Sequence, residues 1–122
     1  MSKFVIRTVH SGIKFDLKAP NGQVILTSEV YTTEAACRTG IDSVRRNAPI
    51  ARIENQTVEH FAVAAHPKFE MYRDRAGMFR FRLKARNGKI IAASESYATK
   101  SGCLGGIESI KENALGAETV KE

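Results

Sequence analysis

An internal repeat is the feature of this sequence that most constrains its fold. When residues 15–48 are placed over residues 81–114 without gaps, 17 of the 34 positions are identical. Unrelated segments of this length share only a few residues, so both segments must build the same structural unit. We assign repeat one to residues 1–60 and repeat two to residues 61–122, and we expect the two to form one compact structural domain.

Each copy shows the pattern of three short strands. Apolar and polar side chains alternate at residues 4–7 and again at residues 14–19, and a third strand is expected at residues 23–28. Asn21 and Gly22 separate the last two strands and tolerate the positive φ angles of a tight hairpin turn. The second copy repeats this pattern at residues 69–73, 78–85 and 89–94, with Asn87-Gly88 at the turn.

A helix is expected after the third strand of each copy. Thr33 and Thr99 are the predicted N-caps, because a threonine oxygen can accept from a free N–H of the first turn. The next apolar residues recur at helical spacing and share one face. They are Cys37, Gly40, Ile41, Val44 and Ala48 in one copy, and Cys103, Gly106, Ile107, Ile110 and Ala114 in the other. A glycine costs about 1 kcal/mol in a helix interior relative to alanine, so its place on both stripes predicts a close approach between helix backbone and sheet.

The predicted fold is α+β, with two tandem β3-α-β repeats merged into one antiparallel sheet. One copy alone would have a marginal core, and a shared sheet removes exposed strand edges. Both helices should lie on one side, with pseudo-twofold symmetry, and Phe15, Leu17, Phe81 and Leu83 should face them. The joining segment, residues 57–67, is apolar at residues 61–65; this favours a covering segment or an extended strand over a flexible tether.

Both copies carry Asn-Gly-x-x-Ile-x-x-Ser-Glu-x-Tyr, followed on the helix by Gly-Ile-x-Ser and then Val or Ile. This motif spans residues 21–44 and 87–110 and resembles the YegP-like family of small uncharacterised bacterial proteins. The resemblance implies two β3-α-β units, as tandem repeats or as two subunits, whose C-terminal strands are exchanged. Residues 51–56 would then lie against copy two and residues 117–122 against copy one. The resemblance implies no activity, cofactor or catalytic residue.

The charge distribution is the strongest functional signal. The net charge is +6, and residues 68–89 alone contain 8 basic and 2 acidic residues. Side chains two apart share a strand face, so the second strand of copy two should display a row of cations, with three more on adjacent turns or strands. The row is Arg80, Arg82, Lys84 and Arg86, and the flanking residues are Arg73, Arg75 and Lys89.

Such a face predicts low-specificity binding of nucleic acid or another polyanion. The equivalent face of copy one, with Lys14, Asp16 and Lys18, is less basic. Reversing the charge of Arg80 and Arg82 should remove binding without unfolding the chain, because both point away from the core. The alternative interpretation is a small protein-interaction or structural module without catalytic activity.

The remaining motifs favour structural roles. Ser28-Glu29-x-Tyr31 and Ser94-Glu95-x-Tyr97 fall at the strand-to-helix junctions, where a polar side chain can satisfy free helix N–H groups. Cys37 and Cys103 lie on the apolar stripes and behave as small hydrophobes. The three histidines lack the spacing of a metal site. We therefore expect no enzyme activity, no cofactor and no metal.

Composition supports a globular chain, because 43% of residues are hydrophobic and 26% are charged. No apolar run approaches the roughly 18 residues of a membrane span. The opening residues show a strand pattern rather than a signal-peptide layout, so the expected location is cytoplasmic, with no membrane partner. Two fused copies satisfy each other, which predicts a monomer or a weak dimer.

Overall fold

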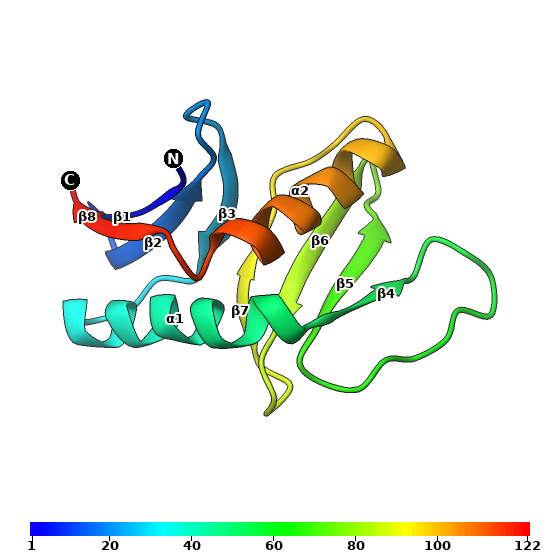
Figure 1. Cartoon of the computed structure of the whole chain (residues 1–122), viewed down its shortest axis with the longest axis horizontal. Coiled ribbons are helices and arrows are strands. Elements are labelled where there is room, and N and C mark those ends of the chain that lie inside the picture. The colour runs from blue at the N-terminus through cyan, green and yellow to red at the C-terminus, as the bar shows by residue number, and fades with distance from the viewer.

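A computed structural model describes residues 1–122 and divides each copy of the repeat into strands and one helix (Figure 1). In chain order the elements are β1 (Lys3–Val9), β2 (Gly12–Lys18), β3 (Val24–Ser28), α1 (Glu34–Asn47), the short 3-10 helix η1 (Ala48–Ile50), β4 (Arg52–Asn55), β5 (Lys68–Arg73), β6 (Phe79–Lys84), β7 (Ile90–Ala93), α2 (Lys100–Asn113) and β8 (Glu118–Lys121). The predicted strands and helices are therefore all present.

The strands form one eight-stranded sheet in the order β4-β5-β6-β7-β3-β2-β1-β8. Both helices pack on one face of this sheet, as predicted (Figure 1). The two halves meet at the antiparallel β3–β7 pair, which joins only Thr27 to Ala93 and Ser28 to Ala92. The sheet is symmetric about this junction, with the same succession of strands on either side.

The sheet is not antiparallel throughout, contrary to the sequence prediction. The outermost pairs, β4 with β5 and β1 with β8, are parallel. Each of these edge strands follows a helix that crosses the sheet face, and it therefore reaches the far edge running in the same direction as its new neighbour. The exchange itself is confirmed: β4 from repeat one completes repeat two, and β8 from repeat two completes repeat one.

Local sequence signals explain the turns and helix starts. Gly22 and Gly88 have φ angles of 85° and 82°, which favour glycine at the hairpin tips. The side-chain oxygens of Asn21 and Asn87 accept hydrogen bonds from backbone N–H groups two residues later, at 2.9 and 3.0 Å. The predicted caps are confirmed, because Thr33 and Thr99 accept from the N–H groups three residues along each helix.

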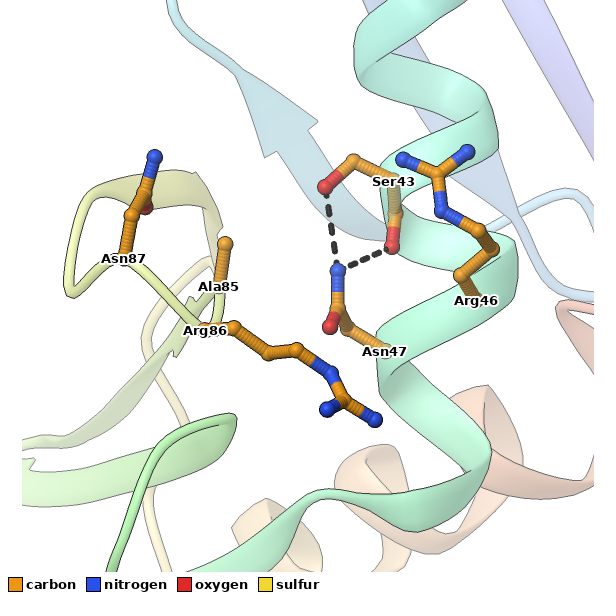
Figure 2. A pocket seen from close by; sticks show the side chains of 6 residues that line it. All are labelled: Ser43, Arg46, Asn47, Ala85, Arg86 and Asn87. Atoms are coloured by element: carbon orange, nitrogen blue, oxygen red, sulfur yellow. Dashed lines mark hydrogen bonds between the residues drawn. The ribbon is translucent and has the colours of Figure 1, made fainter.

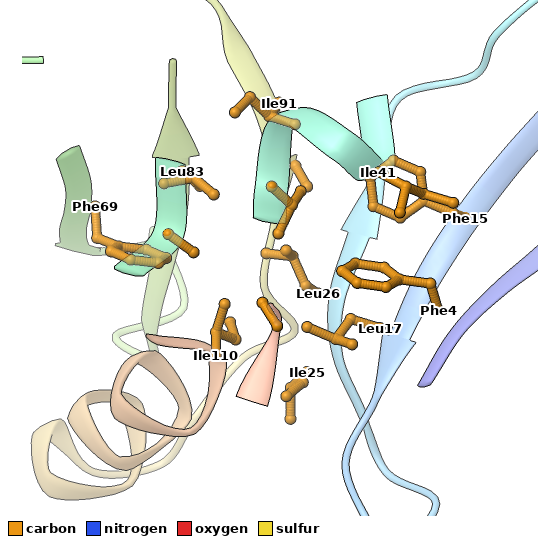
Figure 3. Packing of buried hydrophobic residues seen from close by; sticks show 14 of the residues in the cluster. Phe4, Phe15, Leu17, Ile25, Leu26, Ile41, Phe69, Leu83, Ile91 and Ile110 are labelled. Carbon is orange, nitrogen blue, oxygen red and sulfur yellow. The ribbon is translucent and has the colours of Figure 1, made fainter. Parts of the chain in front are cut away.

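One continuous core joins the repeats. It contains 22 buried hydrophobic residues drawn from both copies (Figure 3). Phe15, Leu17, Phe81 and Leu83 are fully buried on the helix side of the sheet, as predicted. Phe15 packs edge-on against Phe4 at a centroid distance of 5.8 Å. In repeat two, Phe81 packs edge-on against Phe69 at the same distance. This shared core is what a single 60-residue unit could not build alone.

The helix glycines allow a close approach between helix and sheet, as expected, and the groups nearest to them are side chains. A Cβ at Gly40 would overlap the Tyr31 hydroxyl, and a Cβ at Gly106 would overlap the Tyr97 hydroxyl. The tyrosine ring of each copy lies between helix and sheet, stacked on a core phenylalanine. The glycines therefore make room for a tyrosine side chain rather than for the sheet backbone.

The joining segment, residues 57–67, forms no strand, and most of its residues are exposed. The Ala64 N–H donates a 2.8 Å hydrogen bond to the Glu54 carboxylate. Glu54 lies on the sheet face away from the helices, and only 2% of it is exposed. The extended strand is therefore not formed, and covering is limited to the contact of Ala64 with Glu54.

Candidate functional site

Strand β6 displays three of the expected cations on the sheet face opposite the helices. Phe81 and Leu83 enter the core, so the alternating Arg80, Arg82 and Lys84 point the other way. Their side chains are 39%, 30% and 24% exposed. The predicted row is therefore present and accessible to solvent.

These three cations are ion-paired, which the sequence pattern did not indicate. The Nε of Arg80 donates to Asp74 at 2.7 Å, and the Nε of Arg82 donates to Glu70 at 2.6 Å. Lys84 lies 3.3 Å from the same Glu70 carboxylate. Each guanidinium uses only its Nε in these contacts, so the terminal N–H groups remain available as donors.

Behind this row lies a buried charge network. Lys68 bridges Glu54 at 2.7 Å and Glu70 at 3.3 Å, and all three side chains are at most 6% exposed. Burial alone would raise the pKa of Glu54. Hydrogen bonds from Lys68, Gln56 and the Ala64 N–H outweigh it and lower this pKa to about 2. The same balance of burial against cations lowers the pKa of Glu70.

This network corrects the expectation that Arg80 and Arg82 could be reversed without harm. Glu70 is 5% exposed and depends on Arg82 and Lys68 for neutralisation. A glutamate at position 82 would face a buried carboxylate in place of its counter-ion, and isolating buried charge is strongly destabilising. Charge reversal at Arg82 is thus a test of folding as much as of binding.

The other three predicted residues lie around the two ends of β6. Arg73 lies against the Phe79 ring at 4.9 Å and donates to the Gly77 carbonyl at 3.1 Å. Arg75 is exposed in the β5–β6 hairpin, and Arg86 is exposed just beyond the other end of β6. None of the three forms an ion pair. The six candidates therefore fall into two groups: Arg80, Arg82 and Lys84 form ion pairs, whereas Arg73, Arg75 and Arg86 form none.

The equivalent face of repeat one is more basic than its sequence indicates. Asp16 is bound by Arg7 at 2.8 Å and by the Thr27 hydroxyl at 2.7 Å, so its charge is already neutralised. Lys14 and Lys18 lie on the same face and have no ion-pair partner. Cations from both repeats therefore share the sheet face opposite the helices.

A groove beside Arg86 brings in Arg46, which the sequence analysis missed. Two adjoining cavities of about 350 and 590 Å³ lie between α1 and the β6–β7 hairpin (Figure 2). Arg46 lines both cavities. Arg86 lines the smaller one, and Lys89 lines the larger one. The repeat itself held the signal, because Arg46 and Arg86 replace Glu112 and Pro20 at equivalent positions.

The Ser-Glu-x-Tyr motifs are structural, although their hydrogen bonds differ from the expected ones. The Ser28 hydroxyl accepts from the Phe15 N–H at 2.9 Å and donates to the Glu29 carbonyl. It ties β2 to the end of β3 and does not reach the helix. Ser94 makes the same two bonds in repeat two. Burial raises the pKa of the Tyr31 hydroxyl, as it does for Tyr97.

Both cysteines are buried and free. Burial raises the pKa of the Cys103 thiol to about 11 and also raises that of Cys37. A thiol with a raised pKa is a poor nucleophile at neutral pH, which agrees with the packing role inferred from the stripes. No group of three or more His, Cys, Asp or Glu side chains converges as metal ligands would. Neither helix is long and apolar enough to cross a membrane.

Comparison with known proteins identifies relatives of both full and half length. A UPF0339 protein of Photorhabdus laumondii is 42% identical over 103 residues, covering 84% of this chain and 77% of the relative. The UPF0339 protein YegP of Escherichia coli K12 is 40% identical over 110 residues, covering 89% and 84%. A UPF0339 protein of Treponema denticola is 56% identical over 54 residues, which is 44% of this chain but 93% of that protein.

The solution structure of YegP from E. coli, a protein of unknown function, has the same fold. It aligns with a TM-score of 0.80 at 33% identity, covering 99% of this chain and 92% of YegP. The domain of unknown function DUF1508 matches residues 12–55 and 74–120, once in each repeat. None of these names states an activity. The match to both repeats and to relatives over most of the chain shows that the protein belongs to the uncharacterised UPF0339 family, built from the DUF1508 domain.

Proposed function

We propose that this protein binds nucleic acid or a similar polyanion, with little sequence specificity, across the sheet face opposite the helices. The observation that carries the proposal is the surplus of accessible cations contributed to one open face by both repeats. Repeat one supplies Lys14 and Lys18, and repeat two supplies Arg80 and Lys84 with spare donors. Arg75 adds positive charge at the β5–β6 hairpin. Arg73 shares the helix side of β5 with Met71 and lies against Phe79, and Arg86 faces α1, so neither adds to this face.

The ion pairs within this face are compatible with binding. Asp74 and Glu70 hold the Nε groups of Arg80 and Arg82, which orients each guanidinium without using its terminal nitrogens. Lys68, Arg82 and Lys84 share only two carboxylates, Glu54 and Glu70, so the network keeps a net positive charge. A duplex lying on this face would release condensed counter-ions at each neutralised phosphate.

The test is the salt dependence of DNA binding, measured by fluorescence anisotropy on a short duplex. With about four phosphate contacts, the slope of log K against log salt should be near −3.6. Neutralising two cations by Arg80→Gln with Lys84→Gln should make the slope shallower by about 1.8. Lys14→Gln with Lys18→Gln should do the same. Arg82 is left unchanged because it holds the buried Glu70.

A matched control removes the same charge from the helices. Arg38→Gln with Lys100→Gln lowers the net charge by two on the other side of the molecule and should leave the slope unchanged. If all three double variants change binding equally, only the overall charge matters and no face is specific. If the unmodified chain retards no DNA or RNA at about 50 mM salt, where such contacts are strongest, the proposal is abandoned.

The alternative, a small protein-interaction module, rests on a different feature. The joining segment exposes Val58, Phe61 and Val63 beside the edge strand β4, with Val63 78% exposed. Capture from a cell lysate with and without nuclease separates the two functions. Recovered nucleic acid supports the sheet face, whereas a protein partner that survives nuclease and moderate salt supports the alternative.

A further inference from the structure

The groove between α1 and the β6–β7 hairpin has two chemically different ends. The two cavities share Ser43, Arg46, Ala85 and Asn87, so they form one continuous depression. Its smaller cavity, of about 350 Å³, is lined by Arg46 and Asn47 from α1 and by Arg86 from the end of β6 (Figure 2). Its larger cavity, of about 590 Å³, extends past Tyr31 and Ile90.

The smaller cavity is the cationic end of the groove, and its arginines are available to bind an anion. Neither Arg46 nor Arg86 has a hydrogen-bonded or ion-paired partner, and the Arg86 side chain reaches toward Asn47 across the depression (Figure 2). The Asn47 amide donates to the Ser43 carbonyl at 2.8 Å and to its hydroxyl at 3.1 Å, which fixes the floor between the arginines. Two unpaired arginines that line one cavity offer guanidinium donors to a phosphate.

The other end suits a flat, largely apolar group. Tyr31, Gly40, Ile90 and Ile91 line it, and Lys89 and Glu29 provide polar groups. Glu29 is the one acid in the groove and also has no ion-pair partner, so the three cations leave the groove at a net charge of +2. An aromatic ring system could pack on the apolar part while its phosphate reaches the arginines.

The second repeat shows that the fold does not need these arginines. The equivalent groove, beside α2, is lined by Pro20, Glu112 and Asn113 and holds about 170 Å³. Asn113 is the equivalent of Asn47, but Arg86 becomes Pro20 and Arg46 becomes Glu112. The rest of this groove is lined by Met1, Ser2, Gly116 and Ala117. Since the same helix and hairpin form with either set, the two arginines are not required for folding.

We propose that the α1–hairpin groove binds a phosphate monoester that carries a flat organic group, of which a nucleoside monophosphate is the representative. The phosphate lies between Arg46 and Arg86, and the flat group lies toward Tyr31 and Ile90. This site does not depend on the polyanion-binding face, because Arg46 belongs to α1 on the helix side of the sheet. Arg86, which reaches toward Asn47 of α1, belongs to the groove and not to that face.

The test is titration of the intact chain with AMP, adenosine and inorganic phosphate at constant ionic strength, followed by calorimetry and by amide chemical shifts. AMP should bind one site and shift the amides of Ser43, Asn47 and Asn87. Adenosine and inorganic phosphate, which each fill one end, should bind at least tenfold more weakly. Arg46→Glu, which installs the residue of the second repeat, should weaken AMP binding at least tenfold; Arg46→Ala replaces it if the glutamate variant is unstable.

The matched control is Lys100→Glu, which makes the same change of charge at an unpaired lysine on α2. It should leave AMP affinity within twofold. Equal losses in the two variants, shifts outside the groove, or no AMP binding at millimolar concentration would each overturn the proposal. Duplex binding by the sheet face should persist in Arg46→Glu, so the two proposals can fail separately.

Discussion

At the scale of single residues, Gly40 and Gly106 have a steric requirement that the helical Gly105 lacks. Each faces a tyrosine hydroxyl at a position where a Cβ has no space, whereas a Cβ at Gly105 meets nothing. Gly40→Ala should therefore cost about 1–3 kcal/mol of unfolding free energy, as overpacking typically does. Gly105→Ala should instead gain up to about 1 kcal/mol from helix propensity.

Urea unfolding of both variants measures this contrast. In a Tyr31→Phe background the hydroxyl is gone, so Gly40→Ala should cost less than it does in the native chain. If Gly40→Ala is as benign as Gly105→Ala, the tyrosine does not limit this position.

The buried Lys68 gives a second prediction at this scale. Lys68→Met would leave the carboxylates of Glu54 and Glu70, only 2% and 5% exposed, without their shared cation. We expect a loss of about 3 kcal/mol at neutral pH, because an uncompensated buried charge is costly. At the equivalent positions repeat one pairs Val5 with Val120. Replacing Lys68, Glu54 and Glu70 together by Met, Val and Val should therefore restore most of the stability.

The same network sets the acid sensitivity of the chain. Because the pKa of Glu54 is lowered from 4.5 to about 2 in the folded state, its contribution to stability is complete above about pH 4.5. That contribution is lost as the pH falls toward about 2. The Met-Val-Val variant lacks these carboxylates and should lose less stability over this range. Equal acid sensitivity of the two proteins, measured by urea unfolding at several pH values, would assign the effect to other groups.

At the scale of elements, each exchanged strand is held by a cation from a helix. The Nη2 of Arg45 donates to the Ala117 carbonyl at 2.6 Å and to the Thr119 hydroxyl at 2.8 Å, where β8 begins. Lys111, its equivalent on α2, donates to the Ala51 carbonyl before β4. These bonds close each unit with a strand from the other repeat.

Arg45→Ala should loosen β8 selectively. We expect a loss of about 1–2 kcal/mol, because a hydrogen bond from a charged group is worth more than a neutral one. Hydrogen exchange should accelerate at the amides of β8, while β4, held by Lys111, exchanges as before and serves as the internal control. Equal acceleration in both strands would mean that the arginine stabilises the whole sheet rather than this edge.

The elements that could be predicted are those specified by nearby residues. Asn21-Gly22 and Asn87-Gly88 determine the hairpins, and Thr33 and Thr99 start the helices, so the repeat was enough to place them. The exchange of residues 51–56 and 117–122 came from the family resemblance. The edge strands run parallel to their neighbours because each reaches the sheet edge after a helix that crosses the sheet face. The local sequence pattern does not specify this direction.

The candidate site was predicted less completely, for the same reason. The alternation along β6 placed Arg80, Arg82 and Lys84 on one face. Their pairing partner Glu70 is on a neighbouring strand, so its effect depends on register. The α1–hairpin groove joins Arg46 to Arg86, forty residues apart and in different repeats. Only the mismatch between the two repeats at these positions marked them in the sequence.

At the scale of the whole molecule, the exchanged strands explain how half-length relatives can exist. The Treponema denticola protein aligns over 93% of its length with 44% of this chain, so it contains one unit. In the present fold, one unit is completed by a strand from another, and β4 pairs with β5 across the repeat boundary. A lone unit must find this strand in a second copy of itself or leave the sheet edge beside its buried phenylalanines uncovered.

We therefore expect the intact chain to be a monomer and the fragment of residues 1–60 to be a homodimer. In the fragment dimer, β4 of each copy would replace β8 beside β1 of the other, and the two β3 strands would pair as β3 and β7 do here. Light scattering after size-exclusion chromatography measures both masses. The control fragment, residues 1–50, lacks β4 and should neither dimerise nor show cooperative thermal unfolding. A folded monomer from residues 1–60, or a tight dimer from the intact chain, would show that the two fused repeats do not complete each other.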